Sequence, residues 1–448
     1  DQFLLSLPIS SIQKYPRRRL LHPPTRAPFK VTPLMPSLAD LTRVFARIGV
    51  LSFGGPAAQI ALMHRELVEQ RPWLTEAEFL RALSFCMMLP GPEAMQLATY
   101  SGWRLRGTLG GLIAGLLFVL PGAFVVLALA MAYAAYGDLP LMAALLRGVQ
   151  AAVLAIVLHA LWKLSKRALK GRMHWALAIV AFVALFVFNL PFPLVVLGAG
   201  LIGFLSGKPS PTAAAIPFDP RDSIRQSLIW SAVWLVPLAV LWLGNGGFLF
   251  EIGLLFSKLA VLTFGGAYAV LAWLSQAIVQ DKGWLTLPQM IDALGLAETT
   301  PGPLILVTQF VAYLAGHGLG GVMMGLAAAG VALWMTFAPC FLWIFAGAPL
   351  IERLEHAPRL SAALAAITAA VVGVIANLSL WFALHVLFAD LQTLSFGPTR
   401  LILPMLTSLD PAAALLAVLA TALIFWRQWG LVATLTLCAL LGALPALI

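Results

Sequence analysis

Long, unbroken apolar runs recur along the whole sequence, as at residues 112–136 and 176–188. About 20 consecutive apolar residues are enough to cross the hydrocarbon core of a bilayer as one helix. Only 10% of the residues are charged, whereas a soluble domain carries about 25% and needs them to coat its surface. A membrane β-barrel would instead alternate polar and apolar residues in segments of about ten. We therefore predict an all-α polytopic membrane protein with about ten to thirteen spans in a lipid bilayer.

The excess of positive charge does not indicate a nucleic-acid partner. The formal net charge is +10, from 28 basic and 18 acidic residues, but the basic residues lie in short loops between apolar runs. Loops of this kind normally set the orientation of membrane helices. The histidines are scattered, and three isolated cysteines show no metal-binding spacing. We therefore expect no nucleic acid, no metal and no cofactor. The cysteines are Cys86, Cys340 and Cys438.

The first 36 residues differ from everything that follows. They are basic and rich in proline, with Asp1 as their one acid. The prolines exclude a long amphipathic helix, and no apolar run is long enough for a signal peptide. We interpret residues 1–36 as a disordered leader or a non-native extension, in which case Met35 would be the natural start.

Two segments of the sequence, Phe45–Pro92 and Phe256–Pro303, match without a gap at an offset of 211 residues. The matches include Phe-Gly-Gly, Trp-Leu-Thr and Pro-Gly-Pro, in the same order and at the same spacing. Shared apolar composition gives scattered matches but not three ordered motifs at one offset. Self-similarity of this kind indicates repeated structural units. We predict two homologous repeats, 37–210 and 245–448, joined by a linker and a connecting span at 211–244.

Basic loops give the orientation of the two repeats. Two apolar spans separate Arg104 and Arg106 from a basic cluster at 163–172, so both groups lie on one side, the cytoplasmic one. The connecting span then lets the second repeat begin on the other side, and its corresponding stretch around His317 has no Lys or Arg. We therefore predict inverted-topology repeats. This prediction assumes that Phe45–Pro92 enters and leaves the membrane on one side.

A Pro-Gly-Pro motif interrupts an apolar stretch in each repeat, at 90–92 and 301–303. Two prolines around a glycine cannot continue a helix, but the second proline can begin a new one. A helix that begins in mid-membrane points unpaired N–H groups and a positive dipole end into the protein, which suits an anion. The alternative is that each motif only kinks a helix or allows close packing. Recurrence at the same place in both repeats favours a binding function.

Polar side chains near these breaks are candidate ligands and coupling groups. Hydroxyl and amide groups can donate hydrogen bonds to an oxyanion, and an ionisable residue at membrane depth is a functional candidate. Glu93 and Glu298 could gate an anion or carry a coupling proton. For Glu93, a carboxylate that only stabilises a helix N-terminus is an equal alternative. We interpret Arg47 as an interface anchor and the cluster at 163–172 as a topology signal.

At these motifs the sequence resembles the chromate ion transporter (CHR) family in its long two-domain form. The resemblance runs from about residue 37 to the C-terminus and is densest in the two repeat cores. It implies oppositely oriented halves and a multi-pass protein of the cytoplasmic (inner) membrane that exports chromate, with sulfate as a related oxyanion, and confers chromate resistance. The matching pieces are 53–56, 73–74, 89–94, 96–100 and 118–122 in the first half and 263–268, 284–285 and 298–303 in the second.

The expected oxyanion site combines glycines, prolines and polar residues of both repeats. Two helix ends and several donors, with few full cations, would hold a tetrahedral dianion without trapping it. The alternatives are a transporter or channel for sulfate or another small anion, a structural scaffold, and, less favoured, a membrane-embedded enzyme. We expect no catalytic residues, and a homodimer is the candidate assembly. The predicted site residues are Gly54, Gly55, Pro90, Gly91, Pro92, Glu93, Gln96, Gly265, Gly266, Thr299, Thr300, Pro301, Gly302 and Pro303, with Glu93 and Glu298 as coupling candidates.

Overall fold

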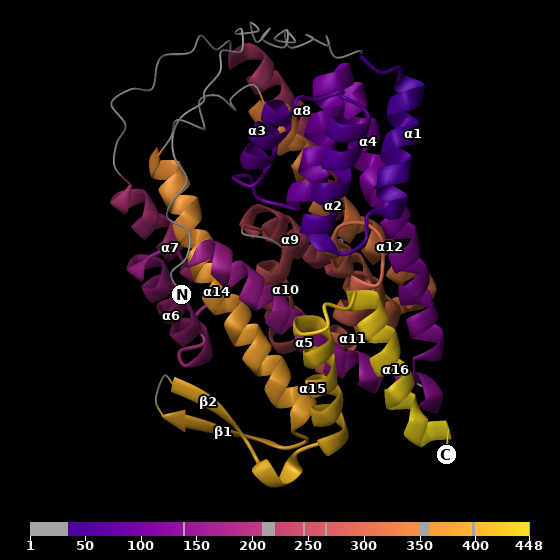
Figure 1. Cartoon of the computed structure of the whole chain (residues 1–448), viewed down its shortest axis with the longest axis vertical. Helices are drawn as coiled ribbons and strands as arrows, with labels where there is room; N and C mark the ends of the chain where they lie inside the picture. The colour runs from indigo at the N-terminus through magenta and orange to yellow at the C-terminus, as the bar shows by residue number, and fades with distance from the viewer. Residues whose placement is uncertain are drawn as a thin grey trace, which may run out of the picture. The chain divides into compact units, whose positions relative to one another are not determined.

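The computed structural model describes residues 35–137, 139–207, 220–244, 247–264, 267–348, 358–396 and 399–447. The chain divides into two compact units, 1–34 and 35–448, and only the second is described here. The expected leader lies almost wholly outside the described residues, as do Gly265, Gly266 and most of the expected linker. Figure 1 shows that the described part consists almost entirely of helices. The prediction of an all-α polytopic membrane protein is therefore confirmed.

Five helical segments in the described part are long and apolar enough to cross a membrane, and four shorter apolar helices accompany them. The count of about ten to thirteen spans stays a prediction, because several apolar runs are divided into helices too short to cross alone. The long segments contain α4 (Glu93–Tyr136), α5 (Pro140–Ala168), α8 (Pro220–Leu243), α12 (Val307–Gly347) and α14 (Pro358–Leu387), and the shorter helices are α6 (Arg172–Phe186), α7 (Phe192–Ser206), α15 (Pro411–Phe425) and α16 (Leu431–Leu447).

Most of the remaining helices recur in the two halves at or near the offset found in the sequence. A π-helix follows α2 and another follows α10, 211 residues later. The capping box of Thr75 and Glu78 recurs as that of Thr286 and Gln289, so the same local signal begins α3 and α11. These elements are α1 (Leu38–Leu51), α2 (Gly55–His64), η1 (Arg65–Gln70) and α3 (Glu76–Cys86), then α9 (Gly247–Leu262), α10 (Ala267–Ser275), η2 (Gln276–Asp281), α11 (Leu287–Glu298) and η3 (Leu304–Leu306).

Both α4 and α12 fold back on themselves. Their backbone leaves the helical conformation at Arg106 and Gly107 in α4 and at Gly320 and Gly321 in α12. A methyl group on Gly102 would overlap the carbonyl oxygen of Gly110, although residues eight apart in a straight helix lie about 12 Å apart. Each element is therefore a helical hairpin. Its short arm begins after the Pro-Gly-Pro motif and ends at the bend, and its long arm follows the bend.

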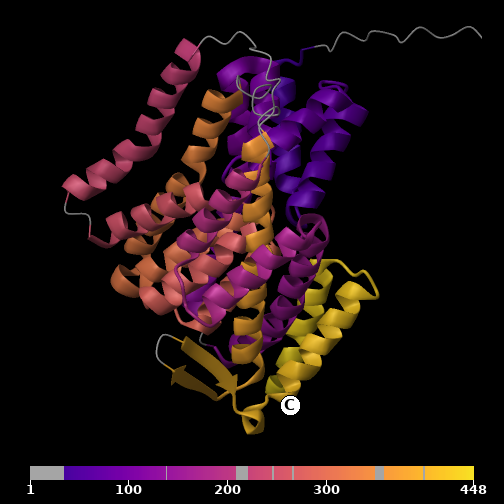
Figure 2. The same cartoon turned by 90° about the vertical axis from the view of Figure 1, so that its left-hand side faces the viewer.

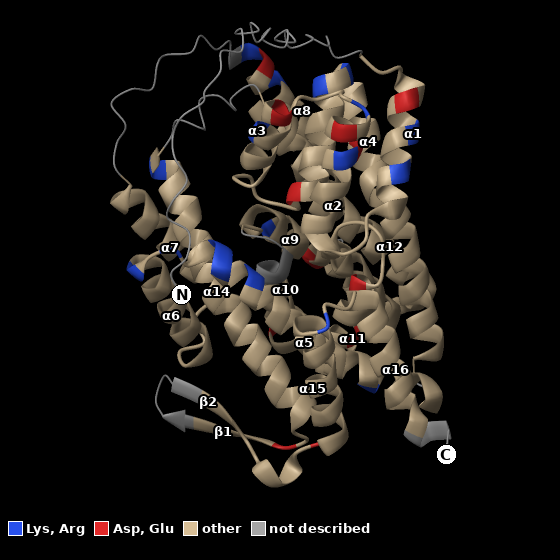
Figure 3. Cartoon of the chain, in the orientation of Figure 1, with Lys and Arg blue, Asp and Glu red and all other residues tan. Residues whose placement is uncertain are grey.

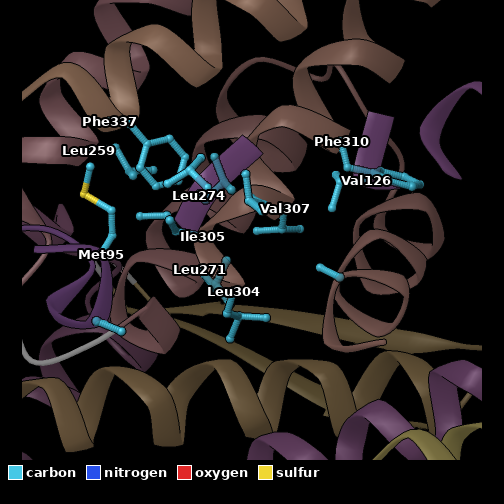
Figure 4. Packing of buried hydrophobic residues seen from close by; sticks show 14 of the residues in the cluster. Met95, Val126, Leu259, Leu271, Leu274, Leu304, Ile305, Val307, Phe310 and Phe337 are labelled. Atoms are coloured by element: carbon cyan, nitrogen blue, oxygen red, sulfur yellow. The ribbon is translucent and has the colours of Figure 1, made fainter. Parts of the chain in front are cut away.

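A hydrophobic core common to both halves surrounds the residues after the second Pro-Gly-Pro motif. Figure 4 shows Leu304, Ile305 and Val307 packed among buried side chains of other elements, including Met95 of α4 and Leu259 of α9. All five side chains are at most 5% exposed. The long arms of α4 and α12 also pack on each other, so the two halves form one packed body around the broken helices.

A two-stranded hairpin is the one departure from helix among the described elements. Strands β1 (Leu391–Phe396) and β2 (Thr399–Pro404) pair antiparallel after α14, with Thr393 opposite Ile402. Figures 1 and 2 both show this hairpin at the end of the 35–448 unit opposite to α1 and α3. The sequence prediction contained no strand here.

Candidate functional site

Two reciprocal hydrogen bonds bring the four glycine motifs together. The Gly91 amide donates to the carbonyl oxygen of Thr263 at 2.8 Å, and the Gly302 amide donates to that of Ser52 at 2.8 Å. Each bond joins the Pro-Gly-Pro motif of one half to the residue before Phe-Gly-Gly in the other. The donors are 211 residues apart, and so are the acceptors. The predicted breaks therefore lie together at the contact between the halves.

Glycine is required at both donors for a conformational reason. Gly91 has φ +115° and Gly302 has φ +89°, a region that residues with a side chain rarely adopt. A methyl group on Gly91 would lie 2.9 Å from Nε2 of Gln96 and 3.1 Å from Sγ of Cys340. One on Gly122 would overlap the carbonyl oxygen of Pro301. Each Pro-Gly-Pro turn thus packs tightly against the long hairpin arm of the other half.

Side-chain amides complete these turns. Gln96 donates from Nε2 to the carbonyl oxygen of Pro90 at 2.6 Å. Gln59 of α2 donates from Nε2 to the carbonyl oxygens of Gly302 at 2.7 Å and Ser52 at 3.3 Å. Gln59 was not among the residues expected from sequence, although it lies only four positions after Gly55. Both amides hold the crossing backbone segments in place.

Several expected anion donors are engaged within the fold. The amides of Gly91 and Gly302 donate hydrogen bonds to carbonyl oxygens of the opposite half. The hydroxyls of Thr299 and Thr300 donate to carbonyl oxygens one turn earlier, those of Leu296 and Ala297. Pro92 and Pro303 directly precede α4 and η3, as the broken-helix prediction requires. Contact of these residues with an oxyanion stays a prediction, and the described geometry gives them a positioning role.

A cavity of about 220 Å³, here called the basic cavity, brings four of the predicted site residues together. Gly54 and Gly55, at the start of α2, line it together with Glu93, the first residue of α4, and Glu298, the last residue of α11. The remaining lining comes largely from α5, which supplies three basic side chains. The full lining is Gly54, Gly55, Pro56, Ala57, Glu93, Ile156, His159, Ala160, Lys163, Leu164, Arg167, Glu298, Ile375 and Leu431.

Two basic side chains of the cavity, Lys163 and Arg167, belong to the cluster at 163–172 that the sequence analysis interpreted as a topology signal. His159, Lys163 and Arg167 are spaced four residues apart on α5, so they share one face of the helix. This spacing is the sequence signal from which a basic face of α5 could have been predicted. Arg167 also lines an adjoining cavity of about 240 Å³, together with Glu93 and Lys170. The expectation of few full cations near the oxyanion stays a prediction, because no observation places the oxyanion in either cavity.

The start of α2 adds polar donors to the same cavity. Gly54 and Gly55 have φ +85° and +77°, and no side chain caps the helix. The first N–H groups of a helix have no intrahelical acceptor, and they carry the positive end of the dipole. No atom of the described residues would lie within 4 Å of a methyl group on Gly55. Two cations, a histidine and a helix N-terminus thus share the cavity with two carboxylates. In this arrangement a bound anion can replace the carboxylates as the partner of the cations.

Comparison with known proteins identifies the family. The sequence model of the chromate transporter family matches residues 39–204 and 250–443. The chain belongs to the chromate transporter family. This confirms the resemblance stated from the motifs, and with it a multi-pass membrane protein whose family is named for transport.

Three curated relatives align with this chain over 345 to 360 residues. A probable chromate transport protein of Synechococcus elongatus is 34% identical over 345 residues, covering 76% of this chain and 83% of the relative. Chromate transport proteins of Cupriavidus metallidurans and Pseudomonas aeruginosa are 32% and 33% identical, covering 76% and 79% of this chain and 81% and 83% of the relatives. No solved structure matches the chain.

Arg47 of this chromate transporter family member is paired with an acid. Its Nη1 lies 3.8 Å from Oε1 of Glu66, a fully buried residue of η1 that also contacts Arg71. A buried carboxylate requires such partners. The position of this ion-pair cluster at the end of the α2–η1 segment supports a structural role for Arg47.

Asp292 is a buried acid that the sequence prediction missed. It lies on α11, is 3% exposed, and accepts hydrogen bonds from Oη of Tyr133 at 2.8 Å and from Nε2 of Gln150 at 2.9 Å. These donors belong to α4 and α5 of the first half, so the carboxylate ties the halves together. A single aspartate in an apolar helix could have been noted as an ionisable residue at membrane depth.

We expect Asp292→Ala to destabilise the protein by about 1–3 kcal/mol, because two buried donors then lose this acceptor. The thermal unfolding midpoint of the purified protein in detergent should fall clearly below that of the wild type. Asp281→Ala, at an exposed aspartate of η2, is the matched control and should unfold with the wild type. Equal midpoints for all three proteins would show that the Asp292 network adds no stability.

Proposed function

We propose that this protein exports chromate across the cytoplasmic membrane, confers chromate resistance, and loads the anion at the basic cavity. The observation that carries the proposal is the meeting of Lys163, Arg167 and the α2 N-terminus with Glu93 and Glu298 in one cavity. The cavity adjoins the glycine motifs that join the halves. Cations and helix N-termini recognise a dianion, and chromate is the anion named for the curated relatives.

The distribution of charge supports loading from the cytoplasm. Figure 3 shows Lys, Arg, Asp and Glu gathered around α1, α3, the bend of α4 and the start of α8, with few near α15, α16 and the hairpin. Positive loops stay on the cytoplasmic side, so the proposed orientation places the hairpin outside. The recurrence of the elements in the same order, at offsets of 211 residues for the π-helices and 218 for α5 and α14, fits two repeats, and the connecting span α8 would give them opposite orientations.

The carboxylates of the cavity supply a coupling mechanism. With no anion bound, ionised Glu93 and Glu298 offset the charge of Lys163 and Arg167. Protonation of a carboxylate leaves the cations uncompensated, which favours a dianion, and loss of the proton favours its release. The carboxylates and the anion would then compete for the same cationic groups, and protonation of the carboxylates favours the anion, so transport depends on pH.

The test of the function is efflux of radiolabelled chromate from cells that carry the gene, with and without an uncoupler. We expect faster efflux and better growth on chromate than in cells with the empty vector, and loss of this difference with the uncoupler. Equal intracellular chromate in the two strains would refute export.

A transporter for sulfate or another small anion is the second candidate function. The groups of the cavity recognise charge and hydrogen-bond acceptors, which chromate and sulfate share as tetrahedral dianions. Uptake of labelled chromate by inverted membrane vesicles, with sulfate, phosphate and molybdate as competitors, separates the candidates. If sulfate inhibits at lower concentration than unlabelled chromate, sulfate is the better substrate.

Glu93→Gln is expected to flatten the pH dependence of transport. In the wild type, affinity for the dianion should rise as the pH falls, because protonated Glu93 no longer competes for the cations; the variant should resemble the low-pH wild type throughout. Sulfate is the suitable probe because it stays a dianion over this range. Asp222→Asn, at an exposed position of α8, should keep the wild-type profile. Identical profiles for Glu93→Gln and the wild type would remove Glu93 from coupling.

A further inference from the structure

A second polar cavity lies between residues 185–189 of the first half and residues of α10, η2, α14 and the β-hairpin in the second, and part of its lining corresponds in position to that of the basic cavity. It has a volume of about 250 Å³ and is here called the amide cavity, after Asn189, Gln276, Gln280 and Asn377, which line it with Trp381 and others. Thr393 and Ile402 of the β-hairpin also line it, so this cavity lies toward the hairpin end of the protein, which Figures 1 and 2 show opposite to α1 and α3.

On one pair of corresponding helices, α5 and α14, the two cavities use equivalent positions. Helix α5 begins at Pro140 and α14 begins at Pro358, 218 residues later. At that offset, the positions of His159, Ala160 and Lys163, which line the basic cavity, become Asn377, Leu378 and Trp381, which line the amide cavity. The correspondence covers three lining positions in each cavity, so it is not a chance overlap of two surface hollows.

Charge is what distinguishes the two cavities. Lys163 and Arg167 of the basic cavity correspond to Trp381 and His385, and none of the described residues that line the amide cavity is a Lys, Arg, Asp or Glu. Its polar groups are side-chain amides, a hydroxyl and an indole N–H. Gln276 and Asn189 already face each other, with Nε2 of Gln276 3.4 Å from Oδ1 of Asn189.

We infer that the amide cavity is a second oxyanion site, through which the same dianion leaves the protein on the hairpin side. This inference rests on the proposed function and adds to it the exit site and the reason for its weak binding. Amides donate hydrogen bonds to a dianion without the charge-assisted strength of Lys or Arg. An anion that moves from the charged site to the neutral one is bound tightly on the cytoplasmic side, where it is scarce, and weakly on the hairpin side, where it must dissociate.

Gln280 offers the sharpest test because it is exposed at the cavity, so either charge can be placed there without burial. Labelled chromate transport is measured in right-side-out and inverted membrane vesicles. With Gln280→Lys, we expect the half-saturating concentration on the hairpin side to fall by about threefold to tenfold. With Gln280→Glu, it should rise by a similar factor, while that on the other side stays unchanged in both variants.

Matched controls keep this inference separate from the proposed function. Gln70→Lys and Gln70→Glu change the net charge equally at an exposed position of η1 in the other half, and should leave the hairpin-side value unchanged. If wild-type vesicles transport no chromate, the proposed function fails. If they transport it and both Gln280 variants match the wild type on the hairpin side, or change in the same direction, the amide cavity is not an anion site.

Discussion

Transport is expected to stop when the glycine of either Pro-Gly-Pro turn is replaced by valine, as Gly91→Val or Gly302→Val. These two turns, each hydrogen-bonded to the other half, are called the crossed turns. The φ angles of +115° and +89° are unfavourable for a β-branched residue, at a cost on the order of 1–3 kcal/mol. Near Gly91, the new side chain would also meet Gln96 and Cys340. The backbone must then move, which breaks the donation to Thr263 or Ser52 and separates the halves where they cross.

The experiment measures labelled chromate uptake by inverted vesicles and the amount of protein in the membrane fraction. Because the long apolar helices are unaltered, both variants should still insert, while uptake falls to the level of vesicles without the protein. Gly330→Val is the matched control, since a methyl group there meets no described atom within 4 Å and the residue is exposed on α12. Wild-type uptake by Gly91→Val or Gly302→Val would show that the crossed turns are not needed for transport.

The broken helices could be predicted because proline and glycine act locally. Pro-Gly-Pro ends one helix and begins the next whatever surrounds it, and the structure places breaks at 90–92 and 301–303. What the motifs join could not be predicted in this way. The bonds from Gly91 to Thr263 and from Gly302 to Ser52 depend on how two halves pack, which one-dimensional spacing does not encode.

The basic cavity was missed for a different reason. A basic cluster after an apolar run has the same sequence signature whether it marks topology or lines a cavity, and only the tilt and neighbours of α5 decide between the two. Glu93 and Glu298 were recognised individually, but they are 205 positions apart and share a cavity with Lys163 and Arg167 only in three dimensions. The β-hairpin was missed although Gly397-Pro398, a turn signal, lies between its strands, because each strand has only six residues and follows an apolar helix.

Arg167→Gln is expected to weaken oxyanion binding by about 10-fold to 100-fold. A hydrogen bond to a charged group contributes about 1.5–3 kcal/mol, and each 1.4 kcal/mol changes affinity about tenfold. Arg167 lines both the basic cavity and the adjoining one, so its loss removes positive charge along the approach of the anion as well. The half-saturating sulfate or chromate concentration in inverted vesicles should rise by this factor, and Arg167→Lys should restore part of the affinity because it keeps the charge.

Lys166→Gln provides the control on the same helix. It removes the same charge one residue away, but the Lys166 side chain lies over the Trp162 ring, with Nζ 3.7 Å from the ring centroid, and lines neither cavity. If the cluster served only to orient the membrane helices, the two glutamine variants would affect transport equally, because each lowers the positive charge of the loop by one. A selective loss in Arg167→Gln would therefore come from the place of Arg167 in the cavities and not from the charge of the loop, and equal behaviour would return the whole cluster to a topological role.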